Sequence, residues 1–141
     1  MSWLRHGFEI NTDKTKLDKD SILRMLRATY WASEVPADDL WESILNSRSY
    51  GMYSPDGEQA GFARLVTDMT RFAWFSDVYV LPVHRGHGLG KWLVETVVND
   101  PAITKVRRIM LSTKDGHALY ERMGFSVLAG EEATKMMMLM R

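Results

Sequence analysis

The chain has 141 residues, no cysteine, and 18 basic against 18 acidic residues, so its formal net charge is zero. This length suffices for one domain with a buried core, which we expect over residues 1–141. The charge balance argues against a nucleic-acid partner, and the lack of cysteine excludes disulfides and thiolate metal sites. The most apolar stretch, residues 72–83, has only the length of a strand. We therefore expect neither a signal peptide nor a membrane partner, and a cytoplasmic location.

The N-terminal part of the chain predicts one strand followed by two helices. Residues 8–13 alternate between apolar and polar side chains, as a half-buried strand does. Residues 19–32 repeat apolar side chains at helical spacing. Residues 36–47 begin with Pro36 and two aspartates. These favour a helix start, because proline fits the first helical turn and acids interact well with the positive end of the helix dipole.

The middle of the chain predicts three antiparallel strands. Residues 48–54 and 59–68 flank the turn sequence Pro55-Asp56-Gly57, so they predict a hairpin. Residues 71–82 predict a third strand, which Pro82 ends because proline has no backbone N–H to donate to a neighbouring strand.

The rest of the chain predicts a helix, a strand, a second helix and a final pair of strands, over residues 88–99, 106–112, 116–124, 125–130 and 134–140. The element order is then β-α-α-β-β-β-α-β-α-β-β. This order predicts an α+β (α/β) domain with a mixed central sheet of about seven strands flanked by about four helices.

A glycine-rich stretch lies between an expected strand and an expected helix, Arg85-Gly86-His87-Gly88-Leu89-Gly90-Lys91. Backbone N–H groups at such a place form an anion-binding nest, the helix dipole adds positive potential, and glycines let a phosphate approach closely. The glycine spacing differs from that of a P-loop and from that of the dinucleotide-binding fingerprint. We therefore expect a site for a pyrophosphate or a similar anion, with a ligand-free turn as the alternative.

Two blocks of the sequence resemble one enzyme family. The segment from Arg85 to Gly90 matches the R/Q-x-x-G-x-G/A signature of the GNAT N-acetyltransferases. ALYERMGF, residues 118–125, is similar to the family's A-x-x-x-Y-E-K-x-G-F segment, and the expected strand order matches over nearly the whole chain. The resemblance, which extends to small bacterial members of undefined acceptor, implies the GNAT fold. It also implies transfer of the acetyl group of acetyl-CoA to a primary amine by direct attack, without an acyl-enzyme. A CoA-binding sensor without turnover is the alternative.

The resemblance also implies roles for two side chains. Tyr120 matches the tyrosine that protonates the departing thiolate, and packing beside the coenzyme is its alternative role. Asp77 lies on the strand that ends at the acetyl group in the family, so it is the candidate for accepting the amine proton or orienting the amine. An ion pair with Arg64 is the alternative role of Asp77. In a regular strand, Asp77 would share one face with Phe75 and Tyr79.

Three segments are expected to contact the coenzyme. Backbone groups of the third antiparallel strand would bind the acetyl carbonyl and the pantetheine amides, and the glycine-rich stretch would bind the pyrophosphate. Thr113, where the family often has asparagine, and His117 would lie beside the pantetheine arm. Asp115, between them, is expected to cap the following helix. The full set is Val78, Tyr79, Val80, Arg85, Gly86, His87, Gly88, Leu89, Gly90, Lys91, Thr113, His117 and Tyr120.

The expected acceptor site consists of Tyr30, Trp31, Arg64, Asp68, Phe72 and Asp77. Acids beside aromatic rings suit a cationic small-molecule or peptide amine, whereas Arg64 would favour an acceptor with a carboxylate. Trp31 could instead be a core residue that packs the first helix on the sheet. The histidines of the chain do not combine with carboxylates into a ligand set, so we expect no metal. The segment 134–140 is apolar and could form an exposed edge strand, which would predict a homodimer. The alternative is that it forms an ordinary buried strand.

Overall fold

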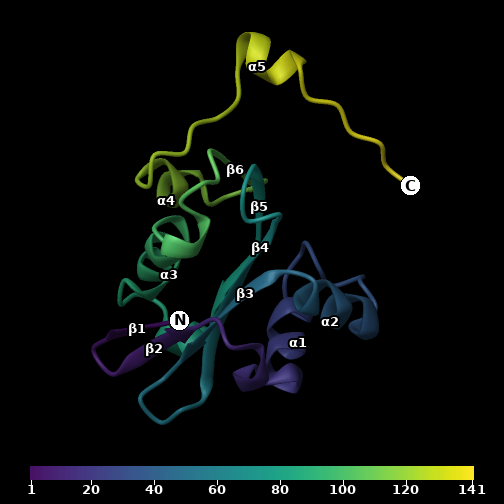
Figure 1. The fold of residues 1–141 in the computed structure, drawn as a ribbon. Coiled ribbons are helices and arrows are strands. Elements are labelled where there is room, and N and C mark those ends of the chain that lie inside the picture. Colours follow the sequence, from purple (N-terminus) through teal and green to yellow (C-terminus); the bar gives the residue numbers. More distant parts are fainter.

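The computed structural model describes residues 1–141 and contains one six-stranded sheet in the order β1-β2-β3-β4-β5-β6 (Figure 1). Neighbouring strands are antiparallel from β1 to β5, and β6 is parallel to β5. The strands are Ser2–Arg5 (β1), Phe8–Asn11 (β2), Arg48–Tyr53 (β3), Gln59–Thr67 (β4), Phe72–Val80 (β5) and Arg108–Met110 (β6). The helices are Lys19–Arg27 (α1), Ala37–Leu45 (α2), Leu89–Val98 (α3), His117–Glu121 (α4) and Gly130–Thr134 (α5).

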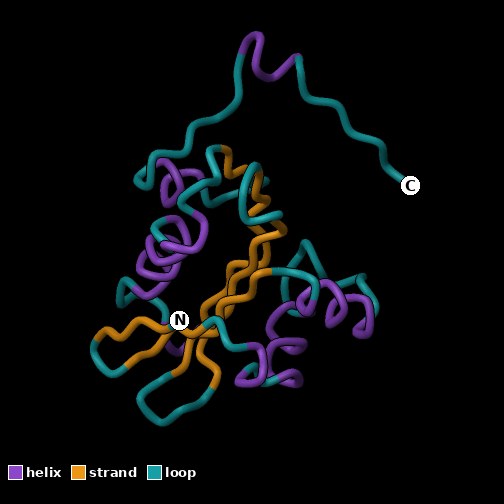
Figure 2. Tube along the Cα trace, viewed as in Figure 1, coloured by secondary structure: helices purple, strands orange, loops and turns teal.

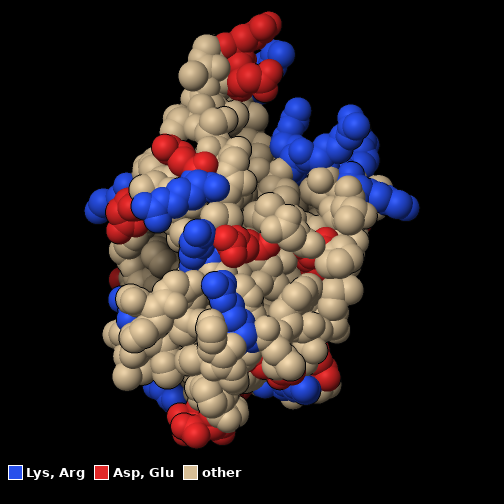
Figure 3. Space-filling view, turned by 90° about the vertical axis from the view of Figure 1, so that its left-hand side faces the viewer, with Lys and Arg blue, Asp and Glu red and all other residues tan.

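Helices cover both faces of the sheet (Figure 2). The larger apolar cluster lies between the sheet and α3, where Leu93, Val94 and Val97 are fully buried. The smaller cluster lies under α1 and α2, which surround Phe62 of β4. None of the helices has the length and apolar character that crossing a lipid bilayer requires. Acidic and basic side chains are mixed over the face that carries α3 and α4, apart from a group of basic ones at its upper right (Figure 3).

The two N-terminal helices follow the prediction, but α1 ends at Arg27 rather than at residue 32. The Asp18 side chain accepts a hydrogen bond from the Ser21 N–H at 3.1 Å and caps the start of α1. At the other end, the Thr29 hydroxyl donates to the Leu26 carbonyl at 2.6 Å and accepts from the Ala32 N–H at 3.3 Å. Such side-chain bonds to the backbone compete with helix continuation, so the chain turns here.

The N-terminal strand β1 was not expected from the sequence. It pairs with β2 in a hairpin whose turn is His6-Gly7, and both turn residues have positive φ, 50° and 81°. Tight two-residue hairpin turns require positive φ at their central positions, and glycine adopts it readily. The His6-Gly7 pair was therefore the available signal for this hairpin.

The C-terminal part of the chain contradicts the prediction of two paired strands over residues 125–130 and 134–140. The chain instead forms a loop, the short helix α5 and an extended tail (Figure 1). The expected turn is a helix here, and exposed ion pairs of Lys135 with Glu131 at 4.0 Å and Glu132 at 3.9 Å add slightly to its stability. The sheet thus has six strands rather than about seven, with five helices rather than four. We term residues 126–141 the C-terminal arm.

Candidate active site

Strands β5 and β6 run side by side only where they begin. The pairing joins residues 72–74 to residues 108–110 and then stops, although a strand was expected over residues 106–112. Beyond this point a cavity of about 550 Å³ opens between the second half of β5, the segment that follows β6 and the connection from α1 to α2. The cavity therefore brings three distant parts of the sequence to one place.

A bulge in β5 decides which side chains enter this cavity. Arg64 of β4 pairs with Ser76 and Phe62 pairs with Tyr79, so Asp77 and the residue after it lie opposite a single residue of β4. Asp77 has a φ of 56°, in the left-handed region. An extra residue in one strand shifts the alternation of the side chains that follow it.

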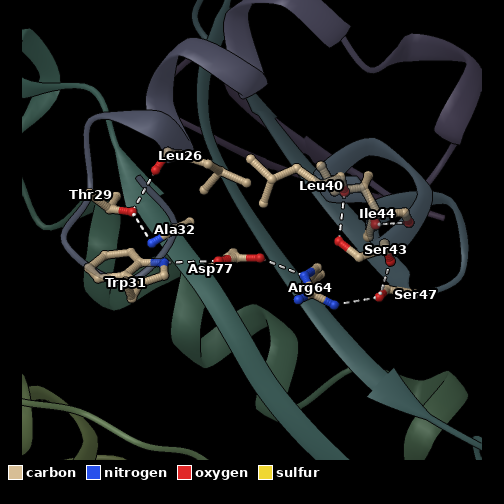
Figure 4. Close-up of polar contacts among 11 residues, drawn as sticks. Leu26, Thr29, Trp31, Ala32, Leu40, Ser43, Ile44, Ser47, Arg64 and Asp77 are labelled. Atoms are coloured by element: carbon tan, nitrogen blue, oxygen red, sulfur yellow. Dashed lines mark hydrogen bonds and ion pairs between the residues drawn. The ribbon is translucent and has the colours of Figure 1, made fainter. Parts of the chain in front are cut away.

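The bulge overturns the expectation that Phe75, Asp77 and Tyr79 share one face. Phe75 packs in the large core cluster together with Val78 and Val80, on the side of α3. Asp77 instead lies toward the α1–α2 connection, in the wall of the cavity (Figure 4).

Asp77 is held at the centre of a hydrogen-bonded chain of side chains (Figure 4). Its Oδ2 accepts from Arg64 Nε at 2.6 Å, and its Oδ1 accepts from Trp31 Nε1 at 2.8 Å. Arg64 Nη1 also donates to Ser47 Oγ at 2.9 Å. Asp77 is buried, with an exposed fraction of 6%. The ion pair with Arg64 is therefore present, and Trp31, which is 45% exposed, is a wall residue rather than a core residue.

Tyr120 of α4 reaches the same cavity from the opposite side. Its ring makes edge-on contacts with Phe75 and Phe125, at centroid distances of 6.2 and 5.8 Å. Burial raises the pKa of the Tyr120 hydroxyl, and the negative charge of Asp115 raises it further. The hydroxyl is thus protonated at neutral pH and can act as a proton donor.

The turn before α4 is shaped by Thr113 rather than by Asp115. The Thr113 hydroxyl accepts a hydrogen bond from the Gly116 N–H at 2.8 Å, whereas Asp115 forms no cap. A Cβ on Gly116 would lie 2.9 Å from the Thr113 hydroxyl and 3.0 Å from the Tyr120 ring. A larger residue at position 116 would therefore push these two side chains apart, so glycine lets Tyr120 lie close to Thr113. His117 begins α4 and lines a neighbouring hollow together with both of them.

The glycine-rich stretch forms the turn that leads into α3. Gly86 and Gly88 have φ values of 84° and 76°, which glycine adopts without strain, and Gly88 is the residue that caps α3. The backbone N–H groups of residues 86–91 donate no hydrogen bond within the chain. Nothing lies within 4 Å of the place where a Cβ on Gly86 or Gly88 would be. The stretch thus presents a row of free donors at a helix N-terminus, as an anion site requires.

The charged side chains of this stretch are partly used within the chain. Arg85 Nε donates to the Val80 carbonyl at 2.8 Å, and its guanidinium lies over the Tyr79 ring at 5.2 Å. Arg85 therefore joins the end of β5 to the glycine-rich turn. Lys91 pairs with Glu95 one helical turn later, at 3.9 Å, and His87 is exposed.

Two expected acceptor residues lie elsewhere. The Asp68 side chain accepts hydrogen bonds from the backbone N–H groups of residues 70–72 and closes the β4–β5 turn. Phe72 follows that turn and is 40% exposed, and neither residue lines the cavity. The structure does bring together Tyr30, Trp31, Arg64 and Asp77 in the cavity wall.

The cavity wall also contains two carboxylates that the sequence did not predict to lie there. Asp39 of α2 and Asp115 contribute carboxylates, so the charged side chains of the wall are Asp39, Asp77, Asp115 and Arg64. The wall thus carries three carboxylates and one guanidinium. Lys114 lies over the Tyr30 ring at 5.4 Å, so a cation already contacts the aromatic part of this wall. No group of three or more His, Cys, Asp or Glu side chains is placed to hold a metal ion.

The chain is similar to several acetyltransferases. A family model described as an acetyltransferase (GNAT) domain matches residues 47–127. A Gibberella zeae protein whose name assigns it as an acetyltransferase is 31% identical over 140 residues, covering 84% of this chain and 78% of that protein.

Solved structures give the same result. A crystal structure from Xanthomonas campestris pv. campestris, assigned to the GNAT family, is 35% identical and superposes with a TM-score of 0.88 over 99% of this chain and 96% of that one. A Bacillus subtilis acetyltransferase solved in complex with CoA is 19% identical and shares the fold, with a TM-score of 0.68 over 85% of this chain and 77% of that one.

Proposed function

Because the chain belongs to the GNAT acetyltransferase family, as predicted from its sequence, we propose that it transfers the acetyl group of acetyl-CoA to a primary amine by direct attack. One observation carries this proposal. A protonated tyrosine, Tyr120, and a buried carboxylate, Asp77, face one cavity from opposite sides. Such an arrangement suits an amine that loses a proton while a thiolate gains one.

The coenzyme would bind along the edge of β5 and at the start of α3. The free N–H groups of residues 86–91 suit its pyrophosphate. The backbone of Val78, Tyr79 and Val80 has no strand beside it on the β6 side. Apart from the Val80 carbonyl, which accepts from Arg85, it is available to the amides of the pantetheine arm, much as a sheet edge binds a peptide. The Bacillus subtilis acetyltransferase, which shares the fold, was solved in complex with CoA, and this supports CoA as the coenzyme of the proposal.

The chemistry divides between the two sides of the cavity. An alkylammonium has a pKa of about 10, so the amine must lose a proton before it attacks the thioester carbonyl. Asp77 accepts that proton, directly or through water, or orients the amine. As the new carbon–nitrogen bond forms and the carbon–sulfur bond breaks, Tyr120 gives its proton to the departing thiolate. No covalent enzyme intermediate is needed, in keeping with a chain that contains no cysteine.

The charge of the wall favours a cationic acceptor. The wall carries three carboxylates against one guanidinium, which favours a cation in the cavity even with Lys114 beside it. Lys114 already lies over the Tyr30 ring, so the Trp31 ring is the one left to contact a cationic acceptor. Arg64 is bonded to Asp77 and Ser47, so it is less suited to hold a carboxylate of the acceptor. We therefore favour a small or peptidic amine whose surroundings carry no acid group.

Thiol release tests this proposal directly. The protein contains no cysteine, so a thiol reagent reports only the CoA formed from acetyl-CoA. The panel of acceptors contains a polyamine, a lysine-containing peptide, and an amino acid whose carboxylate is free. We expect release with the first two and little with the third. No release with any amine, together with no binding of acetyl-CoA, would overturn the proposal, whereas binding without release would favour the CoA-binding sensor.

The role of Tyr120 is tested with a matched pair of variants. Tyr120→Phe removes the proton donor, and we expect kcat to fall by about 10²-fold or more while acetyl-CoA still binds. Tyr53→Phe is the control, because the buried Tyr53 hydroxyl has no hydrogen-bond partner and lies outside the cavity. Equal kcat values for the two variants would remove Tyr120 from the mechanism.

A further inference from the structure

The C-terminal arm, residues 126–141, leaves the body of the molecule (Figure 1). No backbone hydrogen bond joins residues 126–129 or 137–141 to the rest of the chain. The arm ends in the apolar run Met136–Met140, whose exposed fractions reach 95% at Met137 and 82% at Met138. Exposed apolar surface of this extent marks an interaction site.

The sheet has an open edge that such a run would complete. β6 pairs with β5 on one side and with no strand on the other. Two hollows of about 520 and 350 Å³ border this edge, and Ile109, Met110 and Phe125 line both of them. An edge strand with free N–H and C=O groups beside apolar hollows is a template for a further strand.

The arm reaches the hollows of its own chain only with its first part. Glu132, Lys135 and Met136 line the larger hollow and residues 126–128 line the smaller one, whereas residues 137–140 line neither. Residues 126–135 carry it past the end of β6, and the apolar run lies on the far side of α5 (Figure 1). Residues 130–134 form the helix α5, so the segment between residue 126 and the apolar run is not a hairpin turn. The span matched to the Xanthomonas campestris crystal structure, 99% of this chain, includes the arm.

We infer that two copies of this chain exchange their C-terminal arms, so that the Met136–Met140 run of each copy adds to the open β6 edge of the other. Every copy carries both the run and the edge, so a two-fold symmetric pair covers both runs and both edges. The charges agree with this arrangement. The arm carries the exposed acids Glu131 and Glu132 together with Lys135, and exposed Arg107 and Arg108 lie at the start of β6.

The exchange would also complete the wall of the cavity region. The smaller hollow at the β6 edge is lined by Thr113, His117 and Tyr120 on one side and by residues 125–128 on the other. An arm of the second copy at this edge would therefore shield the side chain proposed as proton donor. The inference itself rests on the arm and the edge, not on the proposed function, and its test does not depend on turnover.

The first test is the mass of the full chain in solution by light scattering. We expect a value close to twice the 16.2 kDa of one chain. Leu139→Glu places a charge in the apolar run and should reduce the mass by half. Leu4→Glu is the matched control, because Leu4 and Leu139 are both 77% exposed, and it should leave the mass unchanged. A wild-type protein of single-chain mass would overturn the inference.

Cross-linking then identifies the surfaces that meet. Because the chain has no cysteine, Arg108→Cys on β6 and Met138→Cys in the arm introduce the only thiols. The two single variants are refolded together and treated with a flexible bismaleimide, which tolerates a shift in register. We expect a cross-linked pair of chains, and none when Asp56→Cys in the β3–β4 turn replaces Arg108→Cys. A cross-link within one chain of the double variant, or a dimer without the inter-chain product, would overturn the exchange.

Discussion

Replacement of Asp100 by asparagine tests how strongly a buried charged network stabilises this fold. Asp100 follows α3 and is 1% exposed. Its carboxylate accepts hydrogen bonds from Arg48 Nε at 2.7 Å, from the Tyr50 hydroxyl at 2.7 Å and from the Ala102 N–H at 2.9 Å. Asparagine keeps the size of the side chain but removes the charge, so Arg48 stays in place without its counter-ion.

The expected loss of stability follows from this geometry. Removing one partner of a buried ion pair costs about 3–5 kcal/mol, and we expect about 3 kcal/mol because the Arg48 side chain is 19% exposed. For a chain of this size, about 1 kcal/mol changes Tm by roughly 3 °C, so Tm should fall by roughly 10 °C. The control is Asp56→Asn, since Asp56 is exposed in the β3–β4 turn and its side chain forms no hydrogen bond. The control should change Tm by no more than about 2 °C.

The pH dependence gives this prediction a second readout. Burial opposes the ionisation of Asp100, but the hydrogen bonds from Arg48, Tyr50 and the Ala102 N–H outweigh it and lower the pKa of the carboxyl. A carboxyl with a lowered pKa stabilises the folded state above its unfolded pKa of about 3.9, and this contribution disappears as the pH falls through the folded pKa. Calorimetry should therefore show the full difference in Tm at neutral pH and a smaller one in acid. A fall in Tm of less than about 3 °C at neutral pH, or a difference that does not shrink in acid, would refute the reasoning.

Three further predictions concern the candidate site. Gly88→Ala forces a side chain into a φ of 76°, which costs about 1–2 kcal/mol, so acetyl-CoA should bind roughly tenfold more weakly by calorimetric titration. Gly57→Ala is the matched control, because Gly57 lies in the β3–β4 turn with a similar φ of 84°. Equal acetyl-CoA affinities of the two variants would contradict the proposed role of the glycine-rich turn. Trp31→Phe removes the 2.8 Å hydrogen bond to Asp77, so kcat/KM for the amine should fall while the affinity for acetyl-CoA stays the same. A change in acetyl-CoA affinity alone would exclude Trp31 from the acceptor site. Because the pKa of Tyr120 is raised, kcat should decline with rising pH only above the ordinary tyrosine pKa of about 10. A decline in kcat at a pH below that pKa would argue against Tyr120 as the acid.

Local sequence patterns were sufficient for the elements whose structure depends on nearby residues. The φ values of Gly86 and Gly88 are those of a turn that only glycine enters easily, and the following apolar spacing forms α3 as expected. Pro55-Asp56-Gly57 likewise closes the β3–β4 hairpin with Gly57 at positive φ. At these positions glycine permits, and proline favours, the backbone conformation that the turn requires, so the prediction needs no knowledge of the rest of the fold.

The bulge at Asp77 depends instead on tertiary contacts. Alternation along β5 placed Asp77 beside Phe75, because nothing in the local sequence distinguishes this residue from its neighbours. The left-handed conformation of Asp77 accompanies hydrogen bonds to Arg64 of β4 and to Trp31, which lies far away in the sequence. Both partners were among the expected cavity residues, but their joint effect on the strand required the three-dimensional arrangement.

The apolar run of the C-terminal arm shows a different limit. Five consecutive apolar residues predict a strand that is buried on both faces. The apolar pattern does not tell whether the residues that bury it belong to the same chain or to a second copy. The turn before the run contains Glu131, Glu132 and Lys135, whose spacing also favours a helix. In the structure the helical pairing prevails, so the run is separated from the residues with which it was expected to pair.

The early divergence of β5 and β6 connects the cavity with the exposed arm. After the pairing of residues 72–74 with residues 108–110, the second half of β5 keeps free backbone groups on one side, and Tyr120 faces the space that opens there. The same divergence leaves β6 with three residues, which offer few backbone hydrogen bonds to a further strand. The affinity of an exchanged arm must then come mainly from its apolar side chains. For this reason Leu139→Glu, which leaves every backbone group of the arm intact, should be sufficient to separate the two copies.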